Sequence, residues 1–82
     1  STPSEKIFSR IIRSLDRAQS ELEEAGLTEE SEKITETIKN ARNAVQSSNF
    51  SMATQAIADG LQTFSHTIQS SMLTDTDTKG SS

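Results

Sequence analysis

This 82-residue chain has no cysteine, no tryptophan and no tyrosine, and it has only one proline and three glycines. Without cysteine it forms no disulfide, no thiolate zinc site and no thiolate nucleophile. Three scattered glycines do not make a glycine-rich phosphate-binding loop. No apolar run approaches the roughly 18 residues that a membrane-spanning helix needs. These absences argue against an enzyme and leave one small domain as the expectation.

The chain is also poor in apolar residues and carries a net negative charge. Hydrophobic residues make up 30% of it, and the formal charge is −4. Negative charge argues against a general nucleic-acid binder, and so few aromatic rings offer little for single-stranded bases to stack on. So thin a core predicts modest stability, to which a protein partner or a second copy of the chain would add. The absence of cysteine is compatible with a reducing compartment, so we expect a cytoplasmic protein.

Helical periodicity is the clearest positive feature, and it begins at the N-terminus. Thr2, Pro3 and Glu5 are typical of an N-cap, a first helical residue and the acid of a capping box. Gly26 suits the left-handed residue that ends a helix. We therefore predict a first helix over residues 3–25. Its apolar stripe consists of Ile7, Phe8, Ile11, Ile12, Leu15, Ala18, Leu22 and Ala25.

Two further helices are predicted over residues 29–48 and 51–72. Thr28 is the expected N-cap of the second helix, and Asn49 or Ser51 that of the third. The second helix has a narrow apolar seam, made of Ile34, Ile38, Ala41 and Val45. The third has a longer stripe, made of Phe50, Ala53, Ile57, Leu61, Phe64 and Ile68.

The short connections predict an all-α, three-helix, up-down-up antiparallel bundle over residues 1–73. Residues 74–82 have no periodicity and are expected to form a disordered tail. Ala53, Ala56 and Gly60 form a strip of small side chains beside the apolar stripe of the third helix. We expect this strip to let another helix approach closely.

A basic face runs along the first helix and consists of Lys6, Arg10, Arg13 and Arg17. Their spacing of four, three and four residues places them together, about opposite the apolar stripe. One interpretation is a solvated surface with intrahelical pairs such as Arg13–Asp16 and Arg17–Glu21. The other is a docking face for an acidic peptide or a phosphate-bearing surface.

The third helix is unusual because it has almost no charge. Between Asn43 and Thr74 the only formal charge is Asp59, and Ser, Thr and Gln fill the positions outside the apolar stripe. Protein interfaces are depleted in charge at their centres. Met52 and Met72 lie off the stripe and are expected to add exposed apolar contacts. The alternative is a plain low-charge surface in a chain with 24 Ser and Thr residues.

The single histidine, His66, lies on the predicted polar side of the third helix. Histidine phosphotransfer domains are helical bundles with an exposed histidine, followed three and four residues later by Lys and Gly. Here those positions hold Gln69 and Ser70, so the cation that would favour a phosphoryl group is missing. We predict no catalytic, cofactor-binding or metal-binding residues, and a phosphotransfer-like role for His66 is the alternative.

A helix–corner–helix pattern occupies Ile38 to Leu61, with its corner at Asn49-Phe50-Ser51 and small residues Ala53 and Ala56 after it. In this pattern the chain resembles the helical C-terminal domain shared by the COPII vesicle outer-coat subunit and the steroid receptor RNA activator protein. The resemblance implies a noncatalytic protein-interaction domain. The predicted function is therefore that of an adaptor or scaffold, which docks a partner through the basic face, the uncharged face, or both.

Overall fold

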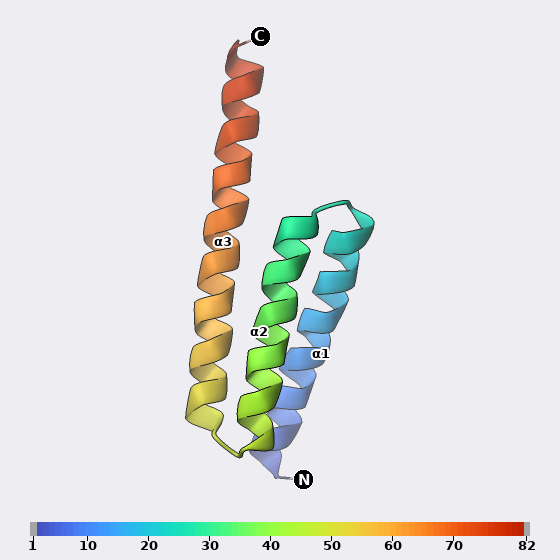
Figure 1. Ribbon diagram of the computed structural model, residues 1–82, viewed down its shortest axis with the longest axis vertical. Helices are drawn as coiled ribbons and strands as arrows, with labels where there is room; N and C mark the ends of the chain where they lie inside the picture. The colour runs from blue at the N-terminus through green and yellow to red at the C-terminus, as the bar shows by residue number, and fades with distance from the viewer. Residues whose placement is uncertain (1, 82) are drawn as a thin grey trace.

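The computed structural model describes the backbone of residues 2–81 and the side chains of residues 2–70 and of Met72. Its elements are α1 (Pro3–Glu24), α2 (Thr28–Gln46) and α3 (Phe50–Ser81), and the part described has no strand. Figure 1 shows them running up, down and up, with α2 between its two neighbours. The predicted three-helix antiparallel bundle is confirmed. The disordered tail was predicted over residues 74–82, and the side chains of these residues are not among those that the structure describes.

The start of α1 forms the predicted capping box. The Glu5 amide donates to Thr2 Oγ1 at 3.2 Å, and the Thr2 amide donates to Glu5 Oε1 at 2.9 Å. The bond from the Thr2 backbone amide stabilises the carboxylate and is the main reason why the pKa of Glu5 lies below its usual range, with a smaller contribution from the Thr2 side chain. Pro3 occupies the first turn, where its missing N–H costs nothing.

Both turns between helices use a residue in the left-handed region of backbone space. Gly26 has φ +80°, and the Leu27 amide donates to the Leu22 carbonyl at 2.9 Å. Ser48 has φ +58°, and the Asn49 amide donates to the Ala44 carbonyl at 2.9 Å. Each bond, running back five residues, marks a Schellman motif. Ser48 pays the Cβ penalty that Gly26 avoids.

The predicted N-cap is confirmed for α3 but not for α2. Asn49 is the N-cap of α3, because its side-chain oxygen accepts a hydrogen bond from the Met52 amide at 3.1 Å. The prediction for α2 was wrong by one residue. Thr28 is already helical, and Leu27 holds the cap position without a side-chain hydrogen bond. The Schellman turn leaves no room for a separate capping residue.

The core forms where α1 and α3 meet α2. Its buried members are Ile12, Leu15, Ile34, Ile38 and Ala41, with Leu22, Val45, Ile57 and Phe64 packed against them. The narrow seam predicted for α2 underestimated its burial. Because α2 has a neighbour on each side, Ser31, Thr37 and Ala44 are buried as well.

Small residues bring α2 and α3 close together, as the strip of small side chains predicted. Ala44 and Ala53 are fully enclosed. At Gly60 a Cβ atom would lie 2.6 Å from Thr37 Cγ2 and 2.7 Å from Thr37 Cβ, far inside van der Waals contact. Only glycine fits at this point, which explains why the helix tolerates it.

Four residues predicted to belong to the apolar stripes remain exposed, namely Ala25 at the C-cap of α1 and three large side chains. Ile7 is 57% exposed, Ile11 36% and Leu61 42%. Their assignment to the core was wrong because α1 and α3 pack on α2 and scarcely on each other. The side chains of α1 and α3 do meet at the N-terminal ends, where the rings of Phe8 and Phe50 stack with centroids 5.7 Å apart.

Candidate functional site

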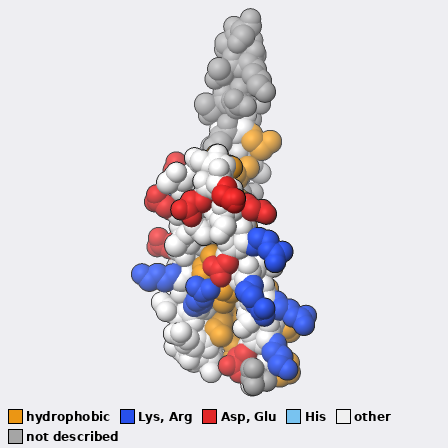
Figure 2. Space-filling view, turned by 90° about the vertical axis from the view of Figure 1, so that its right-hand side faces the viewer, with side chains coloured by type: hydrophobic (Ala, Val, Ile, Leu, Met, Phe, Trp, Pro, Cys, Tyr) orange, Lys and Arg blue, Asp and Glu red, His pale blue; other side chains and the backbone are white. Residues whose placement is uncertain are grey.

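The basic face of α1 is exposed along its whole length. Lys6, Arg10, Arg13 and Arg17 are all in the exposed class and fall within an arc of about 60° around the helix. Figure 2 shows the Lys and Arg side chains gathered on the lower part of this side of the molecule. The four cations therefore present one continuous surface to solvent.

None of these four cations has an ion-pair partner among the side chains that the structure describes. Asp16 instead pairs with Arg42 of α2, with Oδ2 and Nη2 2.8 Å apart. The intrahelical pair Arg13–Asp16 predicted for a merely solvated surface is thus replaced by a bridge between helices. Within the same described part, no ion pair joins Arg17 to Glu21. The positive charge of the basic face remains uncompensated.

Charge is segregated along α1 and α2. The basic face runs from Lys6 to Arg17 of α1, and exposed acids gather around the turn at the C-terminal end of that helix. They are Glu21, Glu23, Glu24, Glu29 and Glu32. Figure 2 shows this acidic group above the basic one. A positive and a negative end arise in a chain whose total charge is only −4.

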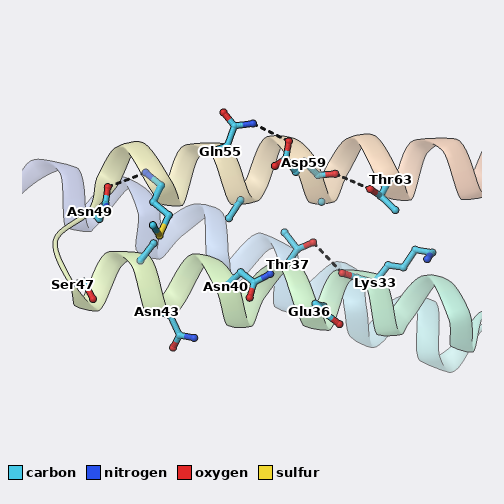
Figure 3. A pocket seen from close by; sticks show the side chains of 14 residues that line it. Lys33, Glu36, Thr37, Asn40, Asn43, Ser47, Asn49, Gln55, Asp59 and Thr63 are labelled. Carbon is cyan, nitrogen blue, oxygen red and sulfur yellow. Dashed lines mark hydrogen bonds between the residues drawn. The ribbon is translucent and has the colours of Figure 1, made fainter.

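A groove of about 860 Å³ runs between α2 and α3. In Figure 3, Thr37 reaches from α2 toward α3, and Asn43 points away. Polar bonds within α3 hold one wall, where Gln55 donates to Asp59 at 2.8 Å and Thr63 donates to the Asp59 carbonyl at 3.0 Å. The lining also includes Lys33, Glu36, Ala44, Ser47, Asn49, Met52, Ala56 and Gly60.

The structure does not bring the two predicted methionines together. Met52 is 57% exposed and lines the groove between α2 and α3, whereas Met72 is 63% exposed and does not. Twenty residues of helix rotate Met72 about 160° away from Met52 around the axis of α3. The predicted uncharged face is therefore two surfaces, and neither includes the basic face of α1.

Ile7, Ile11 and Leu61 form a surface that the sequence did not predict and that we call the apolar strip. A signal for it was present. The adjacent pairs Ile7-Phe8 and Ile11-Ile12 widen the apolar arc of α1 to about 140°, more than one neighbouring helix covers. Phe8 and Ile12 turn toward the core, so Ile7 and Ile11 are left at the edge of the arc.

No other chemistry-bearing cluster comes together in the part of the chain that the structure describes. His66 is exposed, as predicted, on α3. Among the described residues, no group of three or more potential metal ligands is assembled. Within the same residues, no helix is both long enough and apolar enough to cross a bilayer.

Comparisons of the chain with protein-family models, with curated proteins and with solved structures find no match. The resemblance of Ile38 to Leu61 to the helical coat-subunit and activator domain therefore stays a prediction. The candidate site rests on geometry and charge alone.

Proposed function

We propose that this protein is a noncatalytic interaction module, an adaptor or scaffold, that docks an acidic protein partner through the basic face of α1. One observation carries the proposal: Lys6, Arg10, Arg13 and Arg17 are exposed, share one side of the helix and have no ion-pair partner among the described side chains. Four uncompensated cations form a positive surface in an otherwise acidic chain.

The placement of these cations favours a binding role over a stabilising one. The positive end of the helix dipole lies at the N-terminus, so Lys6 at the end of the first turn is unfavourable for the helix itself, and Arg10 and Arg13 gain no stability from the dipole. Arginine also suits recognition of carboxylates, because its guanidinium donates two parallel hydrogen bonds. The resemblance of Ile38 to Leu61 to a protein-interaction domain supports the same class of function, and a cytoplasmic location belongs to this proposal.

Reversal of charge on the basic face tests the proposal. We expect the double variant Arg10→Glu/Arg13→Glu to lose the partners that immobilised wild-type chain captures from cell extract, as counted by quantitative mass spectrometry. The matched control Lys33→Glu/Lys39→Glu changes the net charge equally but lies on α2, and it should retain them. Capture should also weaken at 1 M salt, where the Debye length is only ~3 Å.

The outcome on folding separates binding from structure. Arg10, Arg13 and Lys39 are exposed and Lys33 is half-buried without an ion-pair partner among the described side chains. Since surface charges contribute only about 0–1 kcal/mol each, both double variants should keep the helical circular dichroism of the wild type. Capture that survives both the reversal at Arg10 and Arg13 and high salt would overturn the proposal. The alternative, phosphotransfer on His66, predicts acid-labile phosphate after incubation with a phosphodonor and its loss in His66→Gln.

A further inference from the structure

The apolar strip lies directly beside the basic face. Around the axis of α1, Arg10 and Ile7 are separated by about 60°, and Ser14 lies between them. Ile11 follows on the side nearer the core. A partner held by the basic face therefore meets exposed apolar side chains at the next positions around α1.

Leu61 extends the strip onto α3. The half-buried Ile57 and Phe64 pack against the core cluster and flank Leu61 on α3. Since Phe8 and Phe50 stack, residues of α3 lie level with residues of α1 numbered about 42 lower. Leu61 then lies about 18 Å above Ile7 along the bundle, at 1.5 Å per residue.

The two walls of the strip differ in charge. The wall on α1 is basic, whereas the corresponding side of α3 is formed by Thr54, Ala58 and Ser65, all exposed and uncharged. Asp59, the only acid between Asn43 and Thr74, lines the groove on the other side of α3. Up to the level of Arg17, negative charge in this space is attracted by α1 and meets no acid on the facing side of α3. Glu21, one turn higher on the same side of α1, is the nearest acid.

We infer that the apolar strip is the seat of a fourth helix, supplied by the partner, with apolar residues on one stripe and acids along the flank facing α1. Four-helix bundles bury such stripes between neighbouring helices, and here α2 has two neighbours while α1 and α3 have one each. The inference rests on the proposed function and deepens it, because it specifies the form of the acidic partner.

A synthetic peptide of about 20 residues, roughly 30 Å when helical, is the probe. It carries Leu at the a and d positions of each heptad and Glu on one flank, with a fluorophore at one end. Two matched control peptides replace either the Glu residues by Lys or the Leu residues by Ser. We expect the acidic amphipathic peptide to bind the full chain in fluorescence anisotropy and both controls to bind at least about tenfold more weakly.

Variants of the chain separate this inference from the proposed function. Ile11→Ser and Leu61→Ser should each weaken binding of the acidic peptide about tenfold, since a tenfold change corresponds to one lost apolar contact of about 1.4 kcal/mol. Met52→Ser is the control, because Met52 is a large apolar side chain that is more exposed than Ile11 or Leu61 but lines the opposite groove. It should bind as the wild type does.

The remaining outcomes count against the fourth-helix inference alone or against the proposed function as well. If Arg10→Glu/Arg13→Glu abolishes binding but Ile11→Ser and Leu61→Ser do not, the basic face docks acids without the strip, and the fourth-helix inference is wrong. If none of these variants matters, the proposed function is wrong as well. Self-association of the free chain that Leu61→Ser abolishes, measured by analytical ultracentrifugation, would show that a second copy covers the strip and would overturn the inference.

The absence of cysteine makes a direct mapping experiment possible. An environment-sensitive dye on Ser14→Cys or Ser65→Cys, one on each wall of the strip, should change its emission when the acidic peptide binds. The same dye on Ser47→Cys, in the groove between α2 and α3, should not. A response at Ser47 alone would place the peptide in that groove and contradict the inference.

Discussion

The two sides of α3 are built from residues of different size, and they behave in opposite ways. Toward α2, Ala53 and Gly60 bring the backbones together until no Cβ fits beside Thr37. Toward α1, the large residues Ile57, Leu61 and Phe64 are only partly covered. Small residues let α2 and α3 pack closely, and we call this contact the closed side. The large residues that face α1 are only partly covered, and we call the space between α1 and α3 the open side.

The comparison shows that apolar periodicity does not by itself define the core. Ile34 and Leu61 both belong to regular apolar stripes, yet they are 2% and 42% exposed. The difference arises from the number of neighbours, because α2 lies between two helices and α3 lies beside one. An exposed stripe residue such as Leu61 therefore reflects the number of helices beside it and not a place in the core.

The largest expected effect is a loss of folding stability, and it should differ between Ile34, which is buried on α2 between two helices, and Leu61, which faces the open side. Ile34→Ala should destabilise the fold by about 2–5 kcal/mol, because it leaves a cavity at the most deeply buried of the large side chains. Leu61→Ala should cost only about 1 kcal/mol, because much of that side chain already contacts water. Urea unfolding followed by circular dichroism measures both. Equal losses would mean that Leu61 belongs to the core after all.

A second prediction concerns the closest contact on the closed side. An exposed Gly→Ala change in a helix usually stabilises by about 1 kcal/mol, but Gly60→Ala should destabilise by about 1–3 kcal/mol. The new methyl group would meet Thr37, whose hydroxyl is held by a 3.0 Å bond to the Lys33 carbonyl. Adding Thr37→Ala should restore part of the loss. A Gly60→Ala variant with a raised melting temperature would contradict the close approach.

Local signals in the sequence were sufficient to predict the three helices. They were insufficient to predict which helices pack beside one another. The Thr2–Glu5 capping box and the Gly26 turn depend on residues within a few positions, so both were predicted. Which apolar residues are buried depends on how many helices surround each one, and that is set by contacts distant in sequence. The basic face was predicted because spacing fixes it, but the apolar strip beside it was not.

The turn between α2 and α3 contains one residue with a strained backbone, and a substitution can relieve that strain. Ser48 adopts φ +58°, where a residue with a Cβ is disfavoured, and the turn at Gly26 shows the preferred solution. Ser48→Gly should therefore stabilise by about 1 kcal/mol, measured as a rise in the urea midpoint. The neighbouring Ser47→Gly has no such strain to relieve, since its φ is −87°, and should not stabilise. Equal responses at both positions would rule out the backbone explanation.

The smallest effect should appear at the start of α1, on the open side, and depends on pH. The hydrogen bonds from Thr2 lower the pKa of Glu5 in the folded chain, so this carboxylate stabilises the first turn above its ordinary pKa of about 4.3. The contribution falls away as the pH drops through the lowered value. Amide signals of the first turn, where Lys6 and Ile7 lie, should therefore show fraying in acid, while those around Gly60 remain unchanged.

The variant Glu5→Gln isolates the cause of that pH dependence. Glutamine still accepts the hydrogen bond from the Thr2 amide, as capping boxes with this residue do, but it does not titrate. The first turn of the variant should therefore fray equally at neutral and acid pH, by an amount that the retained bond keeps small. If acid frays the variant as it frays the wild type, the titrating group lies elsewhere. If acid loosens the α2–α3 contact first, the closed side is the weaker one and the comparison is reversed.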